Sequence, residues 1–263
     1  MSVLDERTAA AVKDRDAWEE EAENWVRFAR TQGHDAYWYY RDSFFDEIVP
    51  PPGRLTLEVG CGEGRVTRDL LSRGHRVVSV DGSMTLLQHA LRSDPVRRYA
   101  LADAGHLPLS SGSVEVAVAY NSLMDFDNLA DAMAEIGRVV AADGVFCVCI
   151  THPMQYTGGF DGDELEAPYV LSRPYFGVRR FDETFTRNDI TMRFRGWDRP
   201  MEEYFAALLE AGFVVDAFSE PRPSTDEGRY ARWHRFPMFM FLRAIKRHTE
   251  DQVRGRDRSR EIG

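Results

Sequence analysis

The stretch "LEVGCGEGR", residues 57–65, decides the fold, because an apolar strand runs directly into a glycine-rich turn. Its glycines, Gly60, Gly62 and Gly64, have a G-x-G-x-G spacing. Turns of this kind open a helix whose free backbone N–H groups can receive a nucleotide. The dinucleotide fingerprint places its third glycine where Arg65 stands, so the spacing disfavours a pyrophosphate site. A structural turn that uses glycine only for its positive φ is the alternative.

The residues after this turn alternate between short apolar strands and helical periods. Strands are expected over "LTLEVG" (55–60), "RVVSVDG" (76–82), "RRYALAD" (97–103), "VEVAVAYNS" (114–122) and "GVFCVCITH" (144–152), with helices over about 65–72, 84–93 and 128–140. This alternation predicts an α/β fold, a parallel sheet with helices on both faces. The ligand of such a sheet is expected beyond the carboxyl ends of its central strands.

Composition limits the function classes. The chain has 263 residues with 43% hydrophobic content, enough for one large α/β domain with additions. Its formal net charge of −10 provides no general attraction for nucleic acid or anionic lipid. The N-terminus has no apolar core of the signal-peptide type, and no stretch is long enough to span a bilayer, so we expect a cytoplasmic protein. The three cysteines are expected to be buried inert thiols.

Acidic residues end the next two strands. Asp81 ends the second strand, where a carboxylate can accept hydrogen bonds from both hydroxyls of a ribose. Asp103, followed by Ala104, ends the third, where an adenine edge would lie in the same crevice. Asp81 could instead cap the following helix, and Asp103 could be an ordinary turn residue. The glycine turn, Asp81 and Asp103 come in this order at the ends of three successive strands. This arrangement favours a nucleoside site over separate helix caps and turns.

With these motifs the sequence resembles the class I S-adenosylmethionine-dependent methyltransferases. The matching segments are "LEVGCGEGR", "VVSVDGSMTLL", "ALADAGHLPLSSGSVEVAVAYNSL" and "RVVAADGVFCVCITHP", with weaker support from "MEEYFAALLEAGFVV" near the C-terminus. The resemblance spans about residues 55–152. It implies a Rossmann-like, mostly parallel seven-stranded sheet with helices on both faces, and S-adenosylmethionine as the cofactor, with S-adenosylhomocysteine as its product.

The resemblance also implies roles for individual residues. Gly60, Cys61 and Gly62 would surround the methionine part of the cofactor, with Glu58 behind the loop. Asp81 would hold the ribose hydroxyls, and the rim of that pocket would consist of Gly82, Ser83 and Met84. Asp103 would bind the adenine amino group beside Ala104, and Asn121 would lie near the methionine moiety.

Two helical periods precede the core and predict an N-terminal helical lid over residues 1–50. The segment "HDAYWYYRDSFF", residues 34–45, carries six aromatic side chains, more than one buried stripe needs. Tyr37, Trp38 and Tyr40 are therefore expected to contact cofactor or acceptor, because aromatic faces stabilise a sulfonium or a planar molecule. Packing of all six against the core is the alternative.

A second addition interrupts the core, which is expected to span residues 51–245. The insert, at about 154–200, is rich in glycine, proline and aromatic residues, and "RND" (187–189) predicts a turn between two strands. Tyr156, Tyr175 and Trp197 are expected to form walls of an acceptor pocket. The highly charged segment 246–263 is expected to be a flexible tail.

His152 ends the fifth strand beside the expected crevice and is the candidate general base, because its ordinary pKa is near neutrality. A strand-end histidine bonded to a local backbone group is the alternative. Asp125 and Asp127 precede a helix, and such carboxylates are more often N-caps than metal ligands. With no third ligand in the pattern, no metal is expected.

The sequence therefore predicts methyl transfer from S-adenosylmethionine to an oxygen or nitrogen of a small, planar or aromatic metabolite, by in-line displacement. The expected partner is a small-molecule acceptor, with neither nucleic acid nor membrane. Methylation of a tRNA or protein side chain, suggested only by basic runs such as "RFRGWDR", and a non-catalytic cofactor-binding module are the alternatives. A dinucleotide oxidoreductase is more distant because of Arg65.

Overall fold

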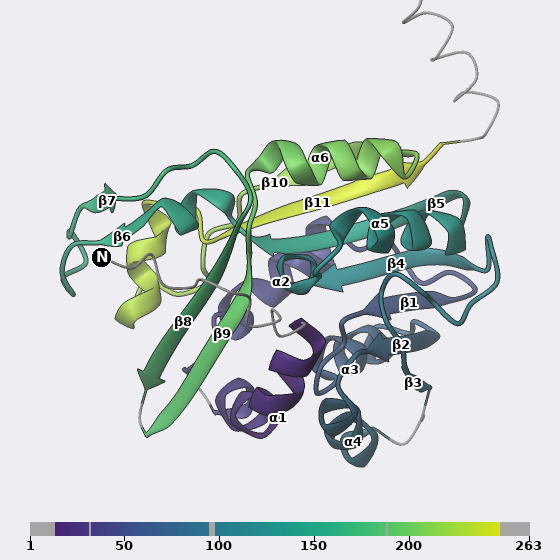
Figure 1. The fold of residues 1–263 in the computed structure, drawn as a ribbon, viewed down its shortest axis with the longest axis horizontal. Coiled ribbons are helices and arrows are strands. Elements are labelled where there is room, and N and C mark those ends of the chain that lie inside the picture. Colours follow the sequence, from purple (N-terminus) through teal and green to yellow (C-terminus); the bar gives the residue numbers. More distant parts are fainter. Residues whose placement is uncertain (1–13, 32, 95–97, 188, 248–263) are drawn as a thin grey trace, which may run out of the picture.

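The computed structural model describes residues 14–31, 33–94, 98–187 and 189–247 (Figure 1). The α-helices are α1 (Asp14–Arg30), α2 (Tyr37–Glu47), α3 (Arg65–Ser72), α4 (Met84–Ser93), α5 (Leu129–Val139) and α6 (Met201–Glu210). The strands are β1 (Thr56–Val59), β2 (Val77–Asp81), β3 (Tyr99–Leu101), β4 (Val114–Tyr120), β5 (Val140–Thr151), β6 (Gly158–Phe160), β7 (Tyr169–Leu171), β8 (Arg179–Arg187), β9 (Ile190–Asp198), β10 (Phe213–Ser219) and β11 (Phe239–Lys246). Three 3-10 helices are η1 (Leu123–Asp125), η2 (Pro153–Thr157) and η3 (Gly228–His234). Most of the predicted charged tail lies outside the described residues.

Seven strands form one sheet in the order β10-β11-β5-β4-β1-β2-β3. Strands β1 to β5 are parallel to one another, whereas β11 is antiparallel to both β5 and β10. The carboxyl ends of β3, β2, β1 and β4 therefore lie next to one another along one edge. This confirms the predicted Rossmann-like sheet and places the four predicted cofactor loops side by side.

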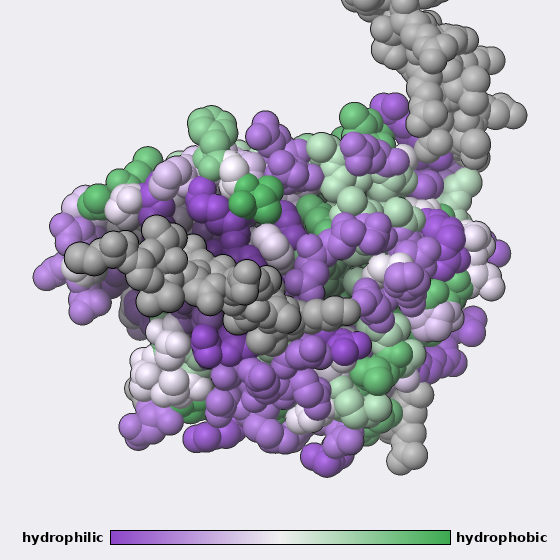
Figure 2. Space-filling view, in the orientation of Figure 1, coloured by the Kyte–Doolittle hydropathy of each residue, from purple (hydrophilic) through white to green (hydrophobic). Residues whose placement is uncertain are grey.

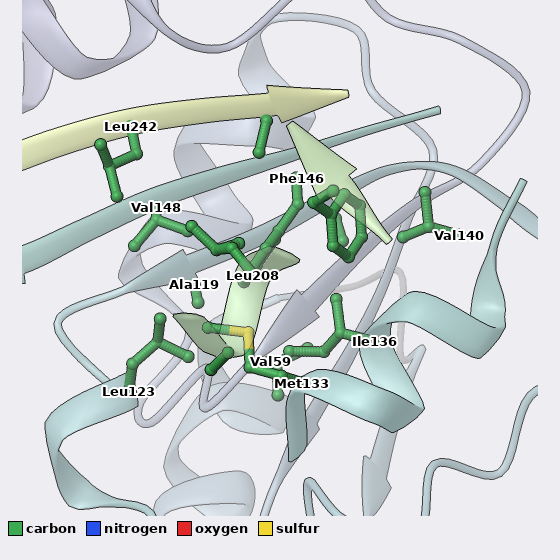
Figure 3. Packing of buried hydrophobic residues seen from close by; sticks show 14 of the residues in the cluster. Val59, Ala119, Leu123, Met133, Ile136, Val140, Phe146, Val148, Leu208 and Leu242 are labelled. Carbon is green, nitrogen blue, oxygen red and sulfur yellow. The ribbon is translucent and has the colours of Figure 1, made fainter. Parts of the chain in front are cut away.

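Each face of the sheet carries its own apolar core. On one face, α5 and α6 pack against the strands, and Figure 3 shows Met133 and Ile136 of α5 and Leu208 of α6 directed toward Phe146 and Val148 of β5. The other core combines α2 and α3 with β4, β5 and β11. The helical periods in the sequence therefore mark the faces that bury apolar area, the main favourable term in folding.

The two additions meet in space. Helix α1 packs against α4 on one side and against β9 on the other, and Figure 1 shows the β8–β9 hairpin running alongside α1. The predicted turn between two strands is confirmed, and Asp189 has the positive φ of 64° that this tight connection requires. An aromatic cluster joins α1 to the hairpin; its members are Trp18, Trp25, Phe28 and Phe194.

The surface view shows mostly hydrophilic residues over α1 and the hairpin, with hydrophobic residues scattered in small groups (Figure 2). Within the described residues, no helix combines the length and apolar character that crossing a bilayer would require. The three cysteines are buried free thiols, as predicted.

Candidate functional site

The glycine turn after β1 is held open by backbone geometry that only glycine adopts without strain. Gly60 and Gly62 have φ values of 73° and 55°. A Cβ on Gly60 would overlap the Cβ of Ser122 and lie 2.9 Å from its Oγ. The Ser122 hydroxyl donates to the Val59 carbonyl at 2.8 Å. Gly60 is therefore required for the close approach of the loop after β4, which aligns two of the predicted cofactor segments.

Asp81 joins the loops after β1 and β2. Its Oδ2 accepts from the Gly62 N–H at 2.7 Å and its Oδ1 accepts from the Ser83 N–H at 2.8 Å. Burial raises the pKa of Asp81, and these two backbone N–H groups oppose that effect. The following helix is capped by Ser83 instead, whose Oγ accepts from the Leu86 N–H at 3.1 Å. Asp81 is therefore not the cap of α4, and its carboxylate joins two of the predicted cofactor loops.

Glu58 lies behind the turn, as the resemblance implies. Its buried carboxyl group accepts a hydrogen bond from Thr67, whose hydroxyl is also 2.8 Å from the Ser79 Oγ. Burial raises the pKa of Glu58 to about 8, and the hydrogen bond from Thr67 opposes this effect. This carboxyl group supports the loop from within the core and does not face solvent.

The remaining predicted cofactor residues lie in the loops after β1, β2, β3 and β4. Asp103 is exposed and accepts from the Gly105 N–H at 2.8 Å, which shapes the turn after β3. Asn121 ends β4 with a φ of 52°, and its N–H donates to the Cys149 carbonyl at 2.7 Å. The others take positions along the same edge: Cys61 is buried, Gly82 and Ala104 are half-buried, and Met84 is exposed. The structure thus gathers the predicted set on one edge; their contacts with a cofactor stay a prediction.

Helix α1 lies within the segment predicted as a lid and contacts these loops through residues that the sequence did not single out. Glu19 accepts from the Ser83 hydroxyl at 2.5 Å and from the Thr85 hydroxyl at 2.6 Å. A Cβ on Gly62 would lie 3.6 Å from the indole nitrogen of Trp25. At the acidic loop, a Cβ on Gly82 would lie 2.8 Å from the Arg15 Cγ. Charged α1 residues that look solvent-exposed in the sequence therefore contact the rim of the predicted cofactor pocket.

The aromatic residues of α2 pack against the sheet. Tyr37 and Tyr40 are 1% and 0% exposed within the apolar core that α2 shares with β4, β5 and β11. The Tyr37 hydroxyl donates to Asp69 at 2.5 Å, and Trp38 is 39% exposed. These positions match the packing alternative for Tyr37 and Tyr40, and acceptor contact by these three residues stays a prediction.

The three aromatic residues predicted in the insert take different positions. Tyr156 of η2 is half-buried and stacks on Phe181 of β8, with ring centroids 5.7 Å apart. The Trp197 indole donates to the Asp14 carboxylate at 2.7 Å. The Tyr175 hydroxyl accepts a hydrogen bond from the Met201 N–H at 3.0 Å, so it provides a partner for a backbone N–H in the first turn of α6. Trp197 thus joins the insert to α1, Tyr156 packs within the insert and Tyr175 orders a helix end, while their contact with an acceptor stays a prediction.

His152 is buried at the end of β5. Its Nδ1 accepts from the Met154 N–H at 3.2 Å, and its Nε2 lies 3.0 Å from a Glu220 carboxylate oxygen. Burial lowers the pKa of His152, and Glu220 raises it. With both ring nitrogens engaged, the geometry favours the local backbone role, and the catalytic role stays a prediction.

The interpretation of Asp125 and Asp127 as N-caps is wrong. Asn128 caps α5 instead, with its side chain accepting from the Asp131 N–H at 3.2 Å. Asp127 accepts from the Asp14 N–H at 3.1 Å, and Asp125 ends η1 at the carboxyl edge of β4. In the described part of the chain, no three His, Cys, Asp or Glu side chains come together as a metal site would require.

Comparison with known proteins agrees with this geometry. A family profile described as a methyltransferase domain matches residues 57–148. A malonyl-[acyl-carrier protein] O-methyltransferase from Geobacter sulfurreducens is 31% identical over 205 residues, covering 74% of this chain and 66% of that protein. One of the same name from Hamiltonella defensa is 32% identical over 89 residues, covering 34% of each chain. The alignments thus span from about a third to two thirds of these relatives.

The fold has solved counterparts. The crystal structure of an S-adenosylmethionine-dependent methyltransferase from Mesorhizobium loti superimposes with a TM-score of 0.63 at 20% identity, covering 81% of this chain and 98% of that one. At this identity the likeness concerns the fold alone. It agrees with the seven-stranded order and the helices on both faces.

Proposed function

We propose that this chain, which belongs to the class I S-adenosylmethionine-dependent methyltransferases, transfers a methyl group to an oxygen or nitrogen of a small planar or aromatic molecule. The observation that carries the proposal is the joining of two strand-end loops by Asp81, through the N–H groups of Gly62 and Ser83. This arrangement leaves a carboxylate with free lone pairs at the centre of the crevice, where parallel α/β sheets bind their ligands.

The residues present fit S-adenosylmethionine. Asp81 can accept from ribose hydroxyls beside the backbone N–H groups that orient it. Cys61 and Gly62 lead toward the N-terminal end of α3, whose first N–H groups have no partner inside the helix and suit the cofactor carboxylate. Asp103 can accept from an amino group such as that of adenine. When bound, this cofactor supplies a methyl group activated by a positively charged sulfur.

The residues of the chain itself align the acceptor with the cofactor and exclude water from the site. Glu19 and Trp25 hold α1 over the cofactor loops, so that helix serves as the lid. The β8–β9 hairpin extends the cover, since β9 packs along α1. Trp18 contacts Phe194 where the lid meets the hairpin, and Tyr156 stacks on Phe181 within the insert, so both additions offer aromatic surface that suits a planar acceptor.

The names of the relatives favour a second candidate, methylation of a carboxylate oxygen on an acid carried by a protein. The charges around the insert weigh against it. Asp14 and Asp127 pair with Arg180, and Asp198 lies 3.8 Å from Arg179, so both arginines already have carboxylate partners and are poorly placed to bind a carboxylate acceptor.

The experiment is a transfer assay with methyl-labelled S-adenosylmethionine, purified protein and a panel of small aromatic hydroxyl, amine and carboxylate acceptors, with malonyl-acyl carrier protein as a further substrate. The proposal expects label on a small aromatic compound. Label on malonyl-acyl carrier protein alone would replace it with the second candidate.

A further inference from the structure

Asn121 directly follows β4 in a backbone conformation that a non-glycine residue seldom adopts. Its φ is 52°, in the left-handed region that asparagine enters more readily than most residues. The next residue, Ser122, donates to the Val59 carbonyl and lies against Gly60. Asn121 is therefore at the carboxyl end of the middle strand of the sheet, beside the glycine turn, with its side chain half-buried. Residues held in this conformation are found most often at functional sites.

The neighbouring strand β5 holds Asn121 at two points. In the parallel register, Cys149 lies opposite Tyr120, the last residue of β4. The Cys149 carbonyl accepts from the Asn121 N–H at 2.7 Å, and the Cys149 thiol donates to Asn121 Oδ1 at 3.5 Å. One residue thus fixes both the backbone and the side-chain amide of Asn121.

The Cys149 thiol keeps its proton and so acts as a donor. It is fully buried, and burial raises its pKa well above the ordinary value, an effect that the Tyr120 side chain opposes. The charged groups that act on Cys149 are Arg65 and Asp35, which are paired with each other at 2.5 Å. A buried S–H group facing Asn121 favours the carbonyl end of the amide, because the NH2 end has only donors.

The NH2 end of the Asn121 amide is left for a ligand. Within the described part of the chain, the one side-chain hydrogen bond of Asn121 is the bond from Cys149 to its Oδ1. Its Nδ2 therefore keeps two N–H donors. Because the thiol end of this contact is buried and the Asn121 side chain is half-buried, the NH2 group is the part of the amide nearer to the crevice.

A fixed NH2 donor distinguishes between the two nucleophiles in the proposed function. A hydroxyl oxygen carries two lone pairs, so one can accept from Asn121 while the other attacks the methyl carbon. The nitrogen of a neutral amine has a single lone pair, and a hydrogen bond to that lone pair would prevent the attack. The orientation that Cys149 imposes on Asn121 therefore favours transfer to oxygen.

We propose that Cys149 is a positioning residue that turns the Asn121 NH2 group toward the methyl acceptor, and that this group selects the hydroxyl oxygen of a phenol. This inference rests on the proposed function and narrows it, since the hydroxyl of a planar aromatic acceptor is a phenol. The phenol O–H bond breaks, with its proton going to water. An oxygen lone pair forms a bond to the methyl carbon while the carbon–sulfur bond breaks, with its electrons going to sulfur. The products are a methyl ether and S-adenosylhomocysteine.

The test uses three phenols and the arylamines of the same skeleton: 4-nitrophenol, 1-naphthol and 8-hydroxyquinoline with 4-nitroaniline, 1-naphthylamine and 8-aminoquinoline. With methyl-labelled S-adenosylmethionine and the full-length protein, we expect kcat/KM at least about tenfold higher for the phenol of each pair that is labelled. Label mainly on the amines, or on none of these compounds although the cofactor binds, would overturn the inference. Absence of cofactor binding would instead overturn the proposed function.

Variants of the two β5 cysteines test the positioning role. Cys149→Ala should reduce the preference for phenols roughly threefold to tenfold, because the Asn121 amide can then turn. Cys149→Ser restores a donor at the same place and should retain the preference. Cys147→Ala is the matched control, since it removes another fully buried thiol, one that donates to the Ile48 carbonyl at 3.4 Å. It should lower the melting temperature as Cys149→Ala does and keep the preference; an unchanged preference in Cys149→Ala would contradict the positioning role.

A substitution of Asn121 keeps the test valid if the cysteine variants misfold. Asn121→Asp preserves the positive φ, because aspartate also tolerates this region. An ionised aspartate accepts hydrogen bonds but cannot donate them, so the preference should move from the phenols toward the amines. If this variant bound the cofactor and kept the full preference for phenols, the Asn121 amide would not be the selecting group.

Discussion

The backbone N–H of Gly62 donates to the Asp81 carboxylate at 2.7 Å, and this bond ties the loop after β1 to the loop after β2. The same carboxylate accepts from the Ser83 N–H at 2.8 Å. Because β1 and β2 are parallel neighbours, both loops leave the sheet at the same edge. A single acidic side chain thus organises the two segments that would surround a nucleoside.

Replacing Gly60 by alanine should destabilise the protein. Alanine at a φ of 73° costs about 1–2 kcal/mol, and its Cβ would also overlap Ser122. Urea unfolding followed by circular dichroism should show a loss of at least about 2 kcal/mol. Gly159→Ala is the control, since nothing lies within 4 Å of a Cβ there. Equal stabilities for the two variants would contradict this account of the turn.

Removing the carboxylate of Glu19 should loosen the lid. Glu19→Gln weakens the bonds from Ser83 and Thr85 that hold α1 over the acidic loop. We expect S-adenosylhomocysteine to dissociate roughly threefold to tenfold faster, as the loss of about 1 kcal/mol implies. Stopped-flow displacement measures this rate. Asp16→Asn, which removes only an exposed pair with Arg15, should leave it unchanged; a common rate for all three proteins would exclude α1 as a lid.

The buried pair of Arg65 and Asp35 should be strongly coupled. Their charged groups are 2.5 Å apart, each side chain is 10% exposed, and the guanidinium also lies over the Trp25 and Tyr37 rings. Arg65→Ala should cost about 3–5 kcal/mol, because it leaves a buried carboxylate uncompensated. The double variant with Asp35→Ala should recover part of that loss in a thermal-unfolding cycle. Strictly additive effects would show that the pair is not coupled.

Glu58 should make stability depend on pH. Its folded pKa of about 8 lies above the ordinary value of 4.5, so the folded chain holds a proton that the unfolded chain releases between these values. Stability should therefore fall as the pH rises from about 5 to about 8. Glu58→Gln, which stays neutral, should lose this slope while keeping an acceptor for Thr67. Parallel unfolding curves for both proteins across this range would contradict the assignment.

Much of the fold follows from local sequence signals. Helix α3 begins at Arg65, directly after a glycine with a φ of 84°, and the strand ends at Asp81 and Tyr120 lie close to the predicted limits. Apolar periodicity and glycine placement are local properties, so a single sequence carries them. The mostly parallel seven-stranded sheet came from the family resemblance and is confirmed by the structure, which adds the order of the strands.

The contacts of the site were less predictable, because they depend on which elements meet. Glu19 and Arg15 look like solvated helix residues until α1 is placed on the acidic loop. The aromatic run of α2 suggested a ligand cover, yet Tyr40 fills the core beside Phe239. Asp125 lies next to a helix start in sequence, but Asn128 caps that helix and Asp125 contacts the lid. Such pairings are set by tertiary packing, which overrides local propensity.

Calorimetric titration tests most directly whether the crevice around Asp81 binds S-adenosylmethionine. The wild type and Asp81→Asn are each titrated with S-adenosylmethionine, S-adenosylhomocysteine and NAD. Asn keeps one oxygen acceptor but loses the charge and half of the acceptor capacity. We expect both adenosyl ligands to bind, with affinity at least about tenfold weaker in the variant, and NAD not to bind. Binding of NAD, or equal adenosyl-ligand affinity in both proteins, would contradict the assignment of this crevice.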